Sequence, residues 1–221
     1  MIIEDCKYNV NNHFFGYIWY KRYCGMKNVA LLLSDGFEEG EAINVVDILR
    51  RLQISVKILS CDLEVNLTSY HGVKIVADDL LSANNNCDFG AIILVGGPPN
   101  TDKLGTDCKV LSFIERHIDM GAYIAALCSS GAKVLAKNSL LGSHQYVCCG
   151  DFHLNYSDGS YINQPIVIDG QFITGQDYGY TIDFAFAVAE VILGDIRTRS
   201  SDMSDVDWVA RHINYRRFTG Y

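Results

Sequence analysis

The sequence predicts a doubly wound α/β sandwich, in which helices cover both faces of a parallel β-sheet. Short apolar runs recur along the chain without alternating polar residues, which is typical of strands buried on both faces. Segments with helical periodicity separate these runs. The 221 residues include 49% hydrophobic and 20% charged side chains and only three prolines. This composition supports one sizeable core and excludes a disordered or collagen-like chain.

The elements follow from these patterns in chain order. The predicted strands are apolar runs that end at turn-forming residues, and they span 28–33, 54–59, 91–95 and 122–127. The predicted helices have one apolar stripe, and they span 39–52, 107–120, 129–136 and about 180–193. Paired short strands are expected within 64–76, around Tyr70-His71-Gly72, and a hairpin from 166–168 and 172–174. His117 is expected at an exposed helix position.

Three stretches of the chain differ in pattern. Residues 1–26 show no sustained period, and Glu4 and Asp5 lie where a targeting leader would carry positive charge. We therefore expect an extension outside the core. Residues 27–195 are expected to form the α/β domain. Residues 196–221 are expected to be a tail in which Ser204-Asp205-Val206-Asp207 opens one more helix as a capping box.

Charge and cysteine content restrict the function classes. The 18 basic and 26 acidic side chains give a net charge of −8, which argues against nucleic acid or an anionic membrane as the main partner. No apolar run approaches the roughly 20 residues of a membrane span. We expect a cytoplasmic protein whose eight cysteines are reduced thiols.

The fold class itself predicts where a site should lie. In an open parallel sheet, ligands bind beyond the carboxyl ends of the strands, near the topological switch point. The segments that follow the predicted strands there are Asp35–Glu41, Gly96–Asn100 and Cys128–Gly131. We therefore expect a carboxylate cluster, a glycine pair and a cysteine to converge.

Cys128 is the sharpest candidate within these segments. It follows a predicted strand, precedes a predicted helix and has small residues on both sides, as in a nucleophile elbow. A helix N-terminus is expected to lower the pKa of the thiol. The alternative is a structural cysteine, since free cysteines are often buried.

The neighbouring segments offer partners for this thiol. The backbone N–H groups of Gly97 and Ser129 are candidate oxyanion donors, with Gly96 as an auxiliary, although a glycine pair can also form only a tight turn. One of Glu38, Glu39 and Glu41 is expected to reach Cys128. A carboxylate there would raise the thiol pKa, whereas a protonated carboxyl would donate a hydrogen bond to the thiolate. Spacing alone leaves this choice open.

Four motifs in this order resemble the ThiJ/PfpI superfamily, most closely its Parkinson-disease-associated, redox-sensing protein deglycase branch. They span 35–41, 94–97, 125–128 and 174–179, the last leading into 183–187. The resemblance covers about residues 27–195. It implies a flavodoxin-like fold, a homodimer and no cofactor, with Cys128 as nucleophile and Glu41 as the protonated carboxyl beside it. It also implies glutathione-independent conversion of methylglyoxal or glyoxal to hydroxy acids, deglycation, chaperone action or oxidant sensing.

Two departures from the family pattern matter. Protease-like members carry histidine directly after the nucleophile, where this chain has Ser129, so a cysteine peptidase is the less favoured alternative. The deglycase branch carries a histidine about twenty residues after the nucleophile, where this chain has Cys148. His144 and His153 flank that position but are offset from it. Class I glutamine amidotransferases share the elbow, but the last third of this chain lacks their His-x-Glu motif.

Cys148 also bears on metal and redox chemistry. The pattern His144-x3-Cys148-Cys149-x3-His153 lacks the two-residue spacer between cysteines of ordinary zinc knuckles, so no metal is expected. If the family geometry holds, Cys148 is expected to lie close enough to Cys128 to form a disulfide with its sulfenate.

Two function hypotheses result. In the first, Cys128 adds to the aldehyde of a 2-oxoaldehyde or a glycated substrate, Glu41 relays protons and the amides of Gly97 and Ser129 hold the oxyanion. In the second, the protein is a non-enzymatic stress sensor or chaperone that responds to oxidation of Cys128. The missing histidine favours the second weakly, and one pocket can serve both.

Overall fold

The computed structural model describes residues 28–194 and 205–216, so the predicted 1–26 extension lies outside the described part. A seven-stranded sheet has the order β10-β11-β7-β6-β1-β2-β5. All neighbouring pairs are parallel except β10 and β11, which form the predicted hairpin. The strands are β1 (Asn28–Leu33), β2 (Ser55–Ser60), β5 (Asp79–Leu80), β6 (Ala91–Leu94), β7 (Tyr123–Leu127), β10 (Ile166–Asp169) and β11 (Phe172–Gly175).

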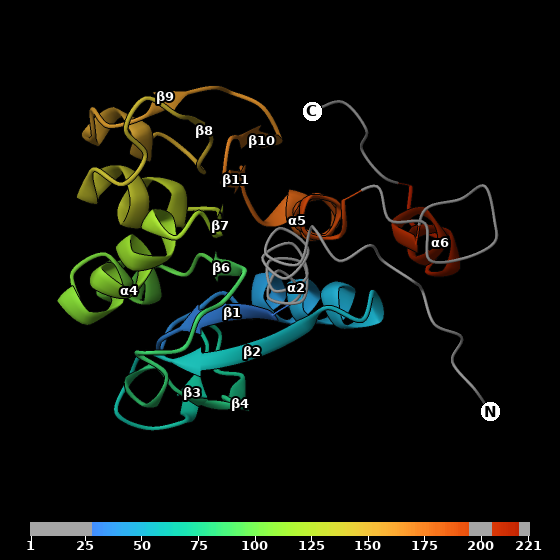
Figure 1. Ribbon diagram of the computed structural model, residues 1–221, viewed down its shortest axis with the longest axis horizontal. Coiled ribbons are helices and arrows are strands. Elements are labelled where there is room, and N and C mark those ends of the chain that lie inside the picture. Colours follow the sequence, from blue (N-terminus) through green and yellow to red (C-terminus); the bar gives the residue numbers. More distant parts are fainter. Residues whose placement is uncertain (1–27, 195–204, 217–221) are drawn as a thin grey trace, which may run out of the picture.

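Helices cover both faces of this sheet, which confirms the predicted fold class. Figure 1 shows α2 and α5 on one side of the strands and α4 on the other. Alternate residues of β1 enter two separate cores: Leu31 packs with α2 and α5, and Leu32 packs with α4. The helices are α2 (Glu39–Arg51), α3 (Pro98–Leu104), α4 (Cys108–Asp119), α5 (Thr181–Leu193) and α6 (Asp205–His212).

Short elements complete the fold. Two small sheets pair β3 (Asn66–Thr68) with β4 (Lys74–Val76) and β8 (Gln145–Tyr146) with β9 (Ser160–Tyr161). The β3–β4 pair is the one predicted around Tyr70-His71-Gly72. The short helical segments are η1 (Leu81–Ala83), η2 (Gly131–Leu135), η3 (Ala136–Asn138), η4 (Phe152–Asn155) and η5 (Tyr178–Tyr180). The helix predicted at 129–136 is thus a π-helical turn, η2, followed by a 3-10 turn, η3.

Two local expectations were wrong. No helix was expected between the 91–95 strand and residue 107, but Pro98 begins α3 there; proline suits the first helical position because the N–H that it lacks would make no hydrogen bond within the helix. His117 was expected to be exposed, but it is buried. Its Nε2 accepts the N–H of Phe89 at 3.1 Å and its ring lies 4.3 Å from that of Phe113. Burial is the main cause that lowers the pKa of His117.

The tail helix α6 packs on the domain. Val206, Val209 and Ala210 join the same core cluster as α5. The hydroxyl of Tyr215 donates to Asp183 Oδ2 at 2.8 Å, which ties the end of the tail to α5. Ser204, the predicted cap, lies outside the described residues.

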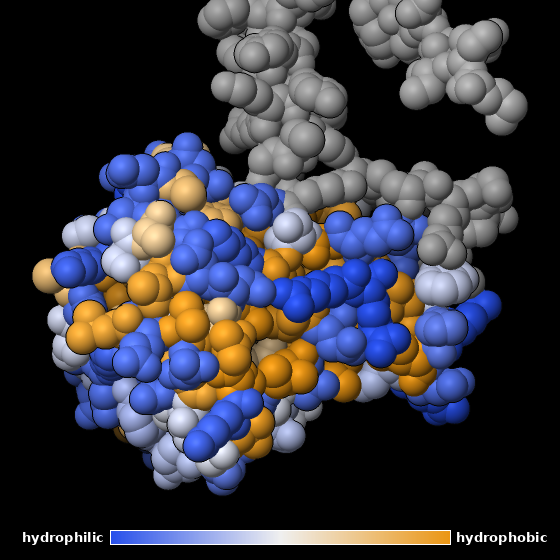
Figure 2. Space-filling view, turned by 90° about the horizontal axis from the view of Figure 1, so that it is seen from below, coloured by the Kyte–Doolittle hydropathy of each residue, from blue (hydrophilic) through white to orange (hydrophobic). Residues whose placement is uncertain are grey.

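The described surface is mixed in character. Figure 2 shows apolar side chains as a band that hydrophilic ones interrupt. Exposed large apolar residues are spread over separate elements, such as Ile43 on α2, Val76 on β4 and Leu154 on η4. The predicted homodimer therefore stays a prediction. None of the described helices combines the length and apolarity needed to cross a bilayer.

Candidate active site

The site lies where the strand order reverses, between β1 and β6. Asn100, at the start of α3, is fully buried and connects the ends of these two strands. Its Oδ1 accepts the N–H of Ser34 at 2.8 Å, and its Nδ2 donates to the carbonyl of Val95 at 2.9 Å. In the sequence, Asn100 was only the last residue of the candidate segment Gly96–Asn100, and no role was predicted for its side chain. Its hydrogen bonds hold the loops after β1 and β6 side by side next to Cys128.

Cys128 occupies a sharp turn directly after β7. Its φ is +62°, in the left-handed region that non-glycine residues rarely adopt. Its N–H donates to the carbonyl of Gly175 at 3.0 Å, so β11 supports the turn. The side chain is half-buried. Such strain is typical of functional sites, and the arrangement matches the nucleophile elbow that the sequence predicts.

Glu41 is the carboxyl that lies beside Cys128. The first turn of α2 places it in the interior, fully buried, where its Oε2 accepts the N–H of Gly96 at 2.6 Å. Burial, followed by the charge of Cys128, raises the pKa of Glu41 to about 9, while the Gly96 N–H acts in the opposite direction. Glu41 is therefore protonated at neutral pH and can donate a hydrogen bond to the Cys128 sulfur.

The other two acids point elsewhere. Glu39 lies 3.1 Å from Nδ1 of His71, in the turn between β3 and β4, and Glu38 lies 3.9 Å from the same atom. The choice among three carboxylates, which spacing left open, is thus resolved by burial and direction.

Gly96 and Gly97 have different roles in the packing. A Cβ at Gly96 would lie 2.8 Å from Cys128 Sγ and 2.9 Å from Glu41 Oε2, so a glycine is needed between these two groups. The N–H of Gly96 is used by Glu41 and is not an oxyanion donor. Gly97 has a φ of +95° and lies against the backbone of Gly36, whose oxygen would be 2.2 Å from an added Cβ. The backbone N–H of Ser129 donates to the Cys128 sulfur itself.

Cys149 is the partner that the sequence analysis missed. Its backbone N–H donates to the carbonyl of Cys128 at 3.3 Å, and its thiol hydrogen-bonds the Cys128 thiol. That hydrogen bond and burial raise the pKa of Cys128, against the donors from Glu41 and Ser129. The same hydrogen bond lowers the pKa of Cys149. The expected lowering of the Cys128 pKa was therefore wrong, because a second thiol adjoins it. The two sulfurs titrate as a pair and share the last proton.

The histidines and cysteines of the 144–153 segment, which was considered as a zinc site, lie in different surroundings. Cys148 is fully buried in the core on the α4 side, and burial raises its pKa to about 11. His144 lies 3.3 Å from Asp169, and His153 stacks on the ring of Tyr161 at 3.7 Å. Neither histidine therefore replaces the one that the resemblance leads us to expect at position 148.

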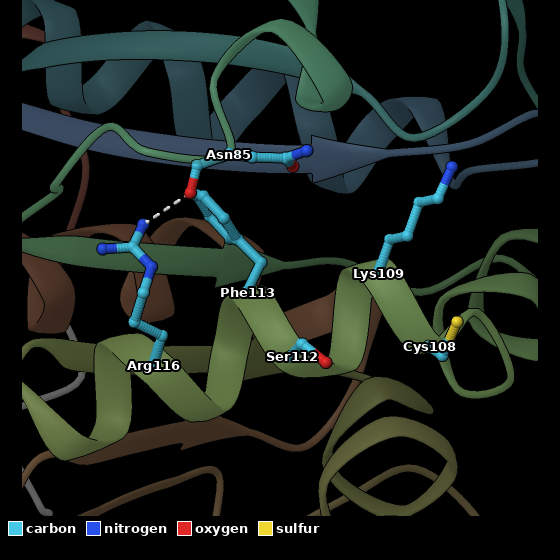
Figure 3. A pocket seen from close by; sticks show the side chains of 6 residues that line it. All are labelled: Asn85, Cys108, Lys109, Ser112, Phe113 and Arg116. Carbon is cyan, nitrogen blue, oxygen red and sulfur yellow. Dashed lines mark hydrogen bonds between the residues drawn. The ribbon is translucent and has the colours of Figure 1, made fainter.

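A separate groove of about 330 Å³ lies along α4, as Figure 3 shows. Cys108, Lys109, Phe113 and Arg116 line it. The guanidinium of Arg116 is already engaged by Asp88 and by the carbonyl of Asn85, at 3.2 Å from the latter. Lys109 is the other cation of this groove, and none of the residues of the elbow lines it.

Comparisons with known proteins agree with this geometry. Residues 27–191 match the model of the DJ-1/PfpI family. Protein DJ-1 homolog B of Arabidopsis thaliana is 25% identical over 170 residues, which are 77% of this chain but 39% of that protein. The chain thus spans well under half of this relative's length.

Two further comparisons cover their counterparts almost completely. Glutathione-independent glyoxalase DJR-1.2 of Caenorhabditis elegans is 28% identical over 173 residues, which are 77% of this chain and 90% of that protein. The crystal structure of a mutant DJ-1 superfamily protein from Salmonella typhimurium is 39% identical. It matches with a TM-score of 0.81 over 86% of this chain and 98% of that one.

Proposed function

The chain belongs to the DJ-1/PfpI family, and on that premise we propose that it converts 2-oxoaldehydes such as methylglyoxal into 2-hydroxy acids without glutathione or a cofactor. The observation that carries this proposal is the buried, protonated Glu41 beside the Cys128 sulfur at a strained elbow. The relative named a glutathione-independent glyoxalase supports the aldehyde substrate. A homodimer, a cytoplasmic location and action on glycated adducts are part of the same proposal.

In the first step, the Cys128 sulfur attacks the aldehyde carbon and forms a hemithioacetal. The thiol proton passes to the adjacent Cys149 sulfur, which can accept it because Cys149 is the more readily deprotonated thiol of the pair. The developing oxyanion receives a hydrogen bond from the backbone N–H of Gly97 and a proton from Glu41, and the N–H of Ser129 turns to it once the sulfur has bonded to carbon. Cys128 therefore has to be a thiolate only while the bond between its sulfur and the aldehyde carbon forms.

In the second step, the hydrogen on the former aldehyde carbon leaves as a proton, and the neighbouring carbonyl carbon gains one. The product is a 2-hydroxy thioester on Cys128. A carboxyl with a pKa of about 9 returns readily to its protonated form at neutral pH, so Glu41 can accept one proton and deliver the other. Water then hydrolyses the thioester. The net reaction adds one water molecule to the oxoaldehyde and releases the hydroxy acid.

Turnover of methylglyoxal tests the proposal directly. Lactate formation would be measured for the wild type, for Cys128→Ser and for Cys108→Ser, the last being a matched control at an exposed cysteine that begins a helical segment. We expect Cys128→Ser to lower kcat/KM by about a thousandfold or more, since the nucleophile is lost, and Cys108→Ser to match the wild type. Wild-type lactate formation at the rate of buffer alone would refute the proposal.

One observation favours a second candidate, a stress protein that acts through oxidation of Cys128. Cys148 stands where the deglycase branch has its histidine, so the proton relay differs from the family pattern. Under this candidate, methylglyoxal is not consumed, and peroxide alters the binding of a partner or an unfolded client. The same turnover assay separates the two candidates.

A further inference from the structure

The chain from Val147 to Cys149 is held at both ends beside the elbow. The N–H of Val147 donates to Thr174 Oγ1 at 2.9 Å, and the N–H of Cys149 donates to the carbonyl of Cys128 at 3.3 Å. The two adjacent cysteines of this segment have different surroundings. Cys148 enters the core near Gly131, and Cys149 faces Cys128.

The positions of Cys128 and Cys149 suit a disulfide. The main-chain hydrogen bond from Cys149 to Cys128 brings the backbones of the two residues together, and a disulfide requires such proximity. The two thiols already lie within hydrogen-bonding range, and both side chains are half-buried rather than enclosed. The side chain of Cys148 does not point toward Cys128, because it packs into the core.

We propose that Cys149, and not Cys148, is the resolving thiol of Cys128, so that the site reduces a hydroperoxide at the cost of an intramolecular Cys128–Cys149 disulfide. The proposal rests on the same nucleophile as the proposed function and adds a second, redox activity to that site. It replaces the expectation that Cys148 forms the disulfide.

Disulfide formation takes two steps, oxidation of Cys128 and attack by Cys149. The Cys128 thiol and hydrogen peroxide give a sulfenic acid and one water molecule, so the sulfur is oxidised by two electrons. The Cys149 sulfur then attacks the Cys128 sulfur, the S–S bond forms and the sulfenic oxygen leaves as a second water molecule. The buried Glu41 carboxyl can donate the proton that this leaving oxygen requires. A small dithiol or a dithiol protein reverses the reaction by thiol–disulfide exchange.

The first test is the mass of the intact protein after about one equivalent of hydrogen peroxide. We expect a loss of about 2 Da that dithiothreitol restores. Trypsin should then release peptide 117–133 joined to peptide 138–197, because Cys128 lies in the first and both vicinal cysteines lie in the second. A disulfide confined to peptide 138–197, or a sulfinic acid on Cys128 with no linkage, would overturn the proposal.

Two matched variants assign the partner, since trypsin leaves both adjacent cysteines in one peptide. With two or more equivalents of hydrogen peroxide, Cys149→Ala should lose the linkage and gain about 32 Da on Cys128 as a sulfinic acid that dithiothreitol does not remove. Cys148→Ala should keep the linkage. The reverse pattern would identify Cys148 as the partner and refute the proposal. If either variant fails to fold, fragmentation of the linked wild-type peptides between residues 148 and 149 in the mass spectrometer assigns the partner instead.

These measurements do not depend on aldehyde turnover. Lactate formation without the linkage would contradict only the disulfide, and the linkage without lactate formation would contradict only the proposed function.

Discussion

Cys108 begins the helix α4 and Cys128 lies three residues before the helical segment η2, yet their surroundings have little in common. Cys108 is the first residue of α4, is exposed, and follows Asp107, whose side chain accepts the N–H of Lys109. Cys128 has a positive φ and lies between the buried Glu41 and the thiol of Cys149. A nearby helix start therefore does not by itself give a cysteine the surroundings of a nucleophile. Strain and buried proton donors from other elements distinguish the elbow.

The two regions also differ in what they contribute to stability. The start of α4 follows the ordinary rule for a helix N-terminus, with its first N–H groups partly satisfied by an N-cap side chain. The elbow breaks two rules, since it holds a non-glycine residue at positive φ and a buried carboxyl whose Oε1 has no hydrogen-bond partner of ordinary geometry among the described residues. Changes at the elbow should therefore alter the free energy of unfolding in ways that changes at α4 do not.

Glu41→Gln should have the largest effect on stability. In the unfolded chain Glu41 ionises near pH 4.5, whereas in the folded protein its pKa is about 9. Between these values the folded state holds one more proton, so the wild-type free energy of unfolding falls as pH rises, by about 1.4 kcal/mol per pH unit. Glutamine does not titrate. From pH 6 to pH 8 the variant should gain about 3 kcal/mol relative to the wild type, as measured by urea unfolding.

The control for this prediction is Glu115→Gln on the exposed face of α4. It should follow the wild-type pH profile. Parallel profiles for Glu41→Gln and the wild type would show that Glu41 is ionised in the folded protein, which would remove the proton donor from the proposed mechanism.

Gly96→Ala should have the next largest effect. The added Cβ would meet Cys128 Sγ at 2.8 Å and Glu41 Oε2 at 2.9 Å, so one of these groups would have to shift. We expect a loss of about 1 to 3 kcal/mol in the free energy of unfolding. Gly179→Ala is the matched control, because its nearest neighbour, Asp177 Oδ1, would lie at an ordinary 3.5 Å. An equal effect of the two variants in urea unfolding would mean that the site is not closely packed.

Much of this contrast is visible in the sequence. Continuous apolar runs predict the buried strands, and the small residues around Cys128 predict the elbow, because both depend on local pattern. Asn100 could not be singled out, because its role exists only once β1 and β6 are neighbours. The direction of Cys149 was equally hidden. In an irregular segment, a shift of one residue decides which of two adjacent thiols faces the site.

Asp107→Ala should have the smallest of these effects and should leave the elbow unchanged. Its Oδ1 accepts the N–H of Lys109 at 2.9 Å, and loss of such a cap costs about 1 kcal/mol. Asp107→Asn keeps an acceptor at the same position and should restore most of that loss in urea unfolding. Because α4 supplies no side chain to the elbow, both variants should form the Cys128–Cys149 disulfide as the wild type does. A changed peptide map in Asp107→Ala would mean that the two helix starts are coupled, and that the contrast between Cys108 and Cys128 does not arise from local surroundings alone.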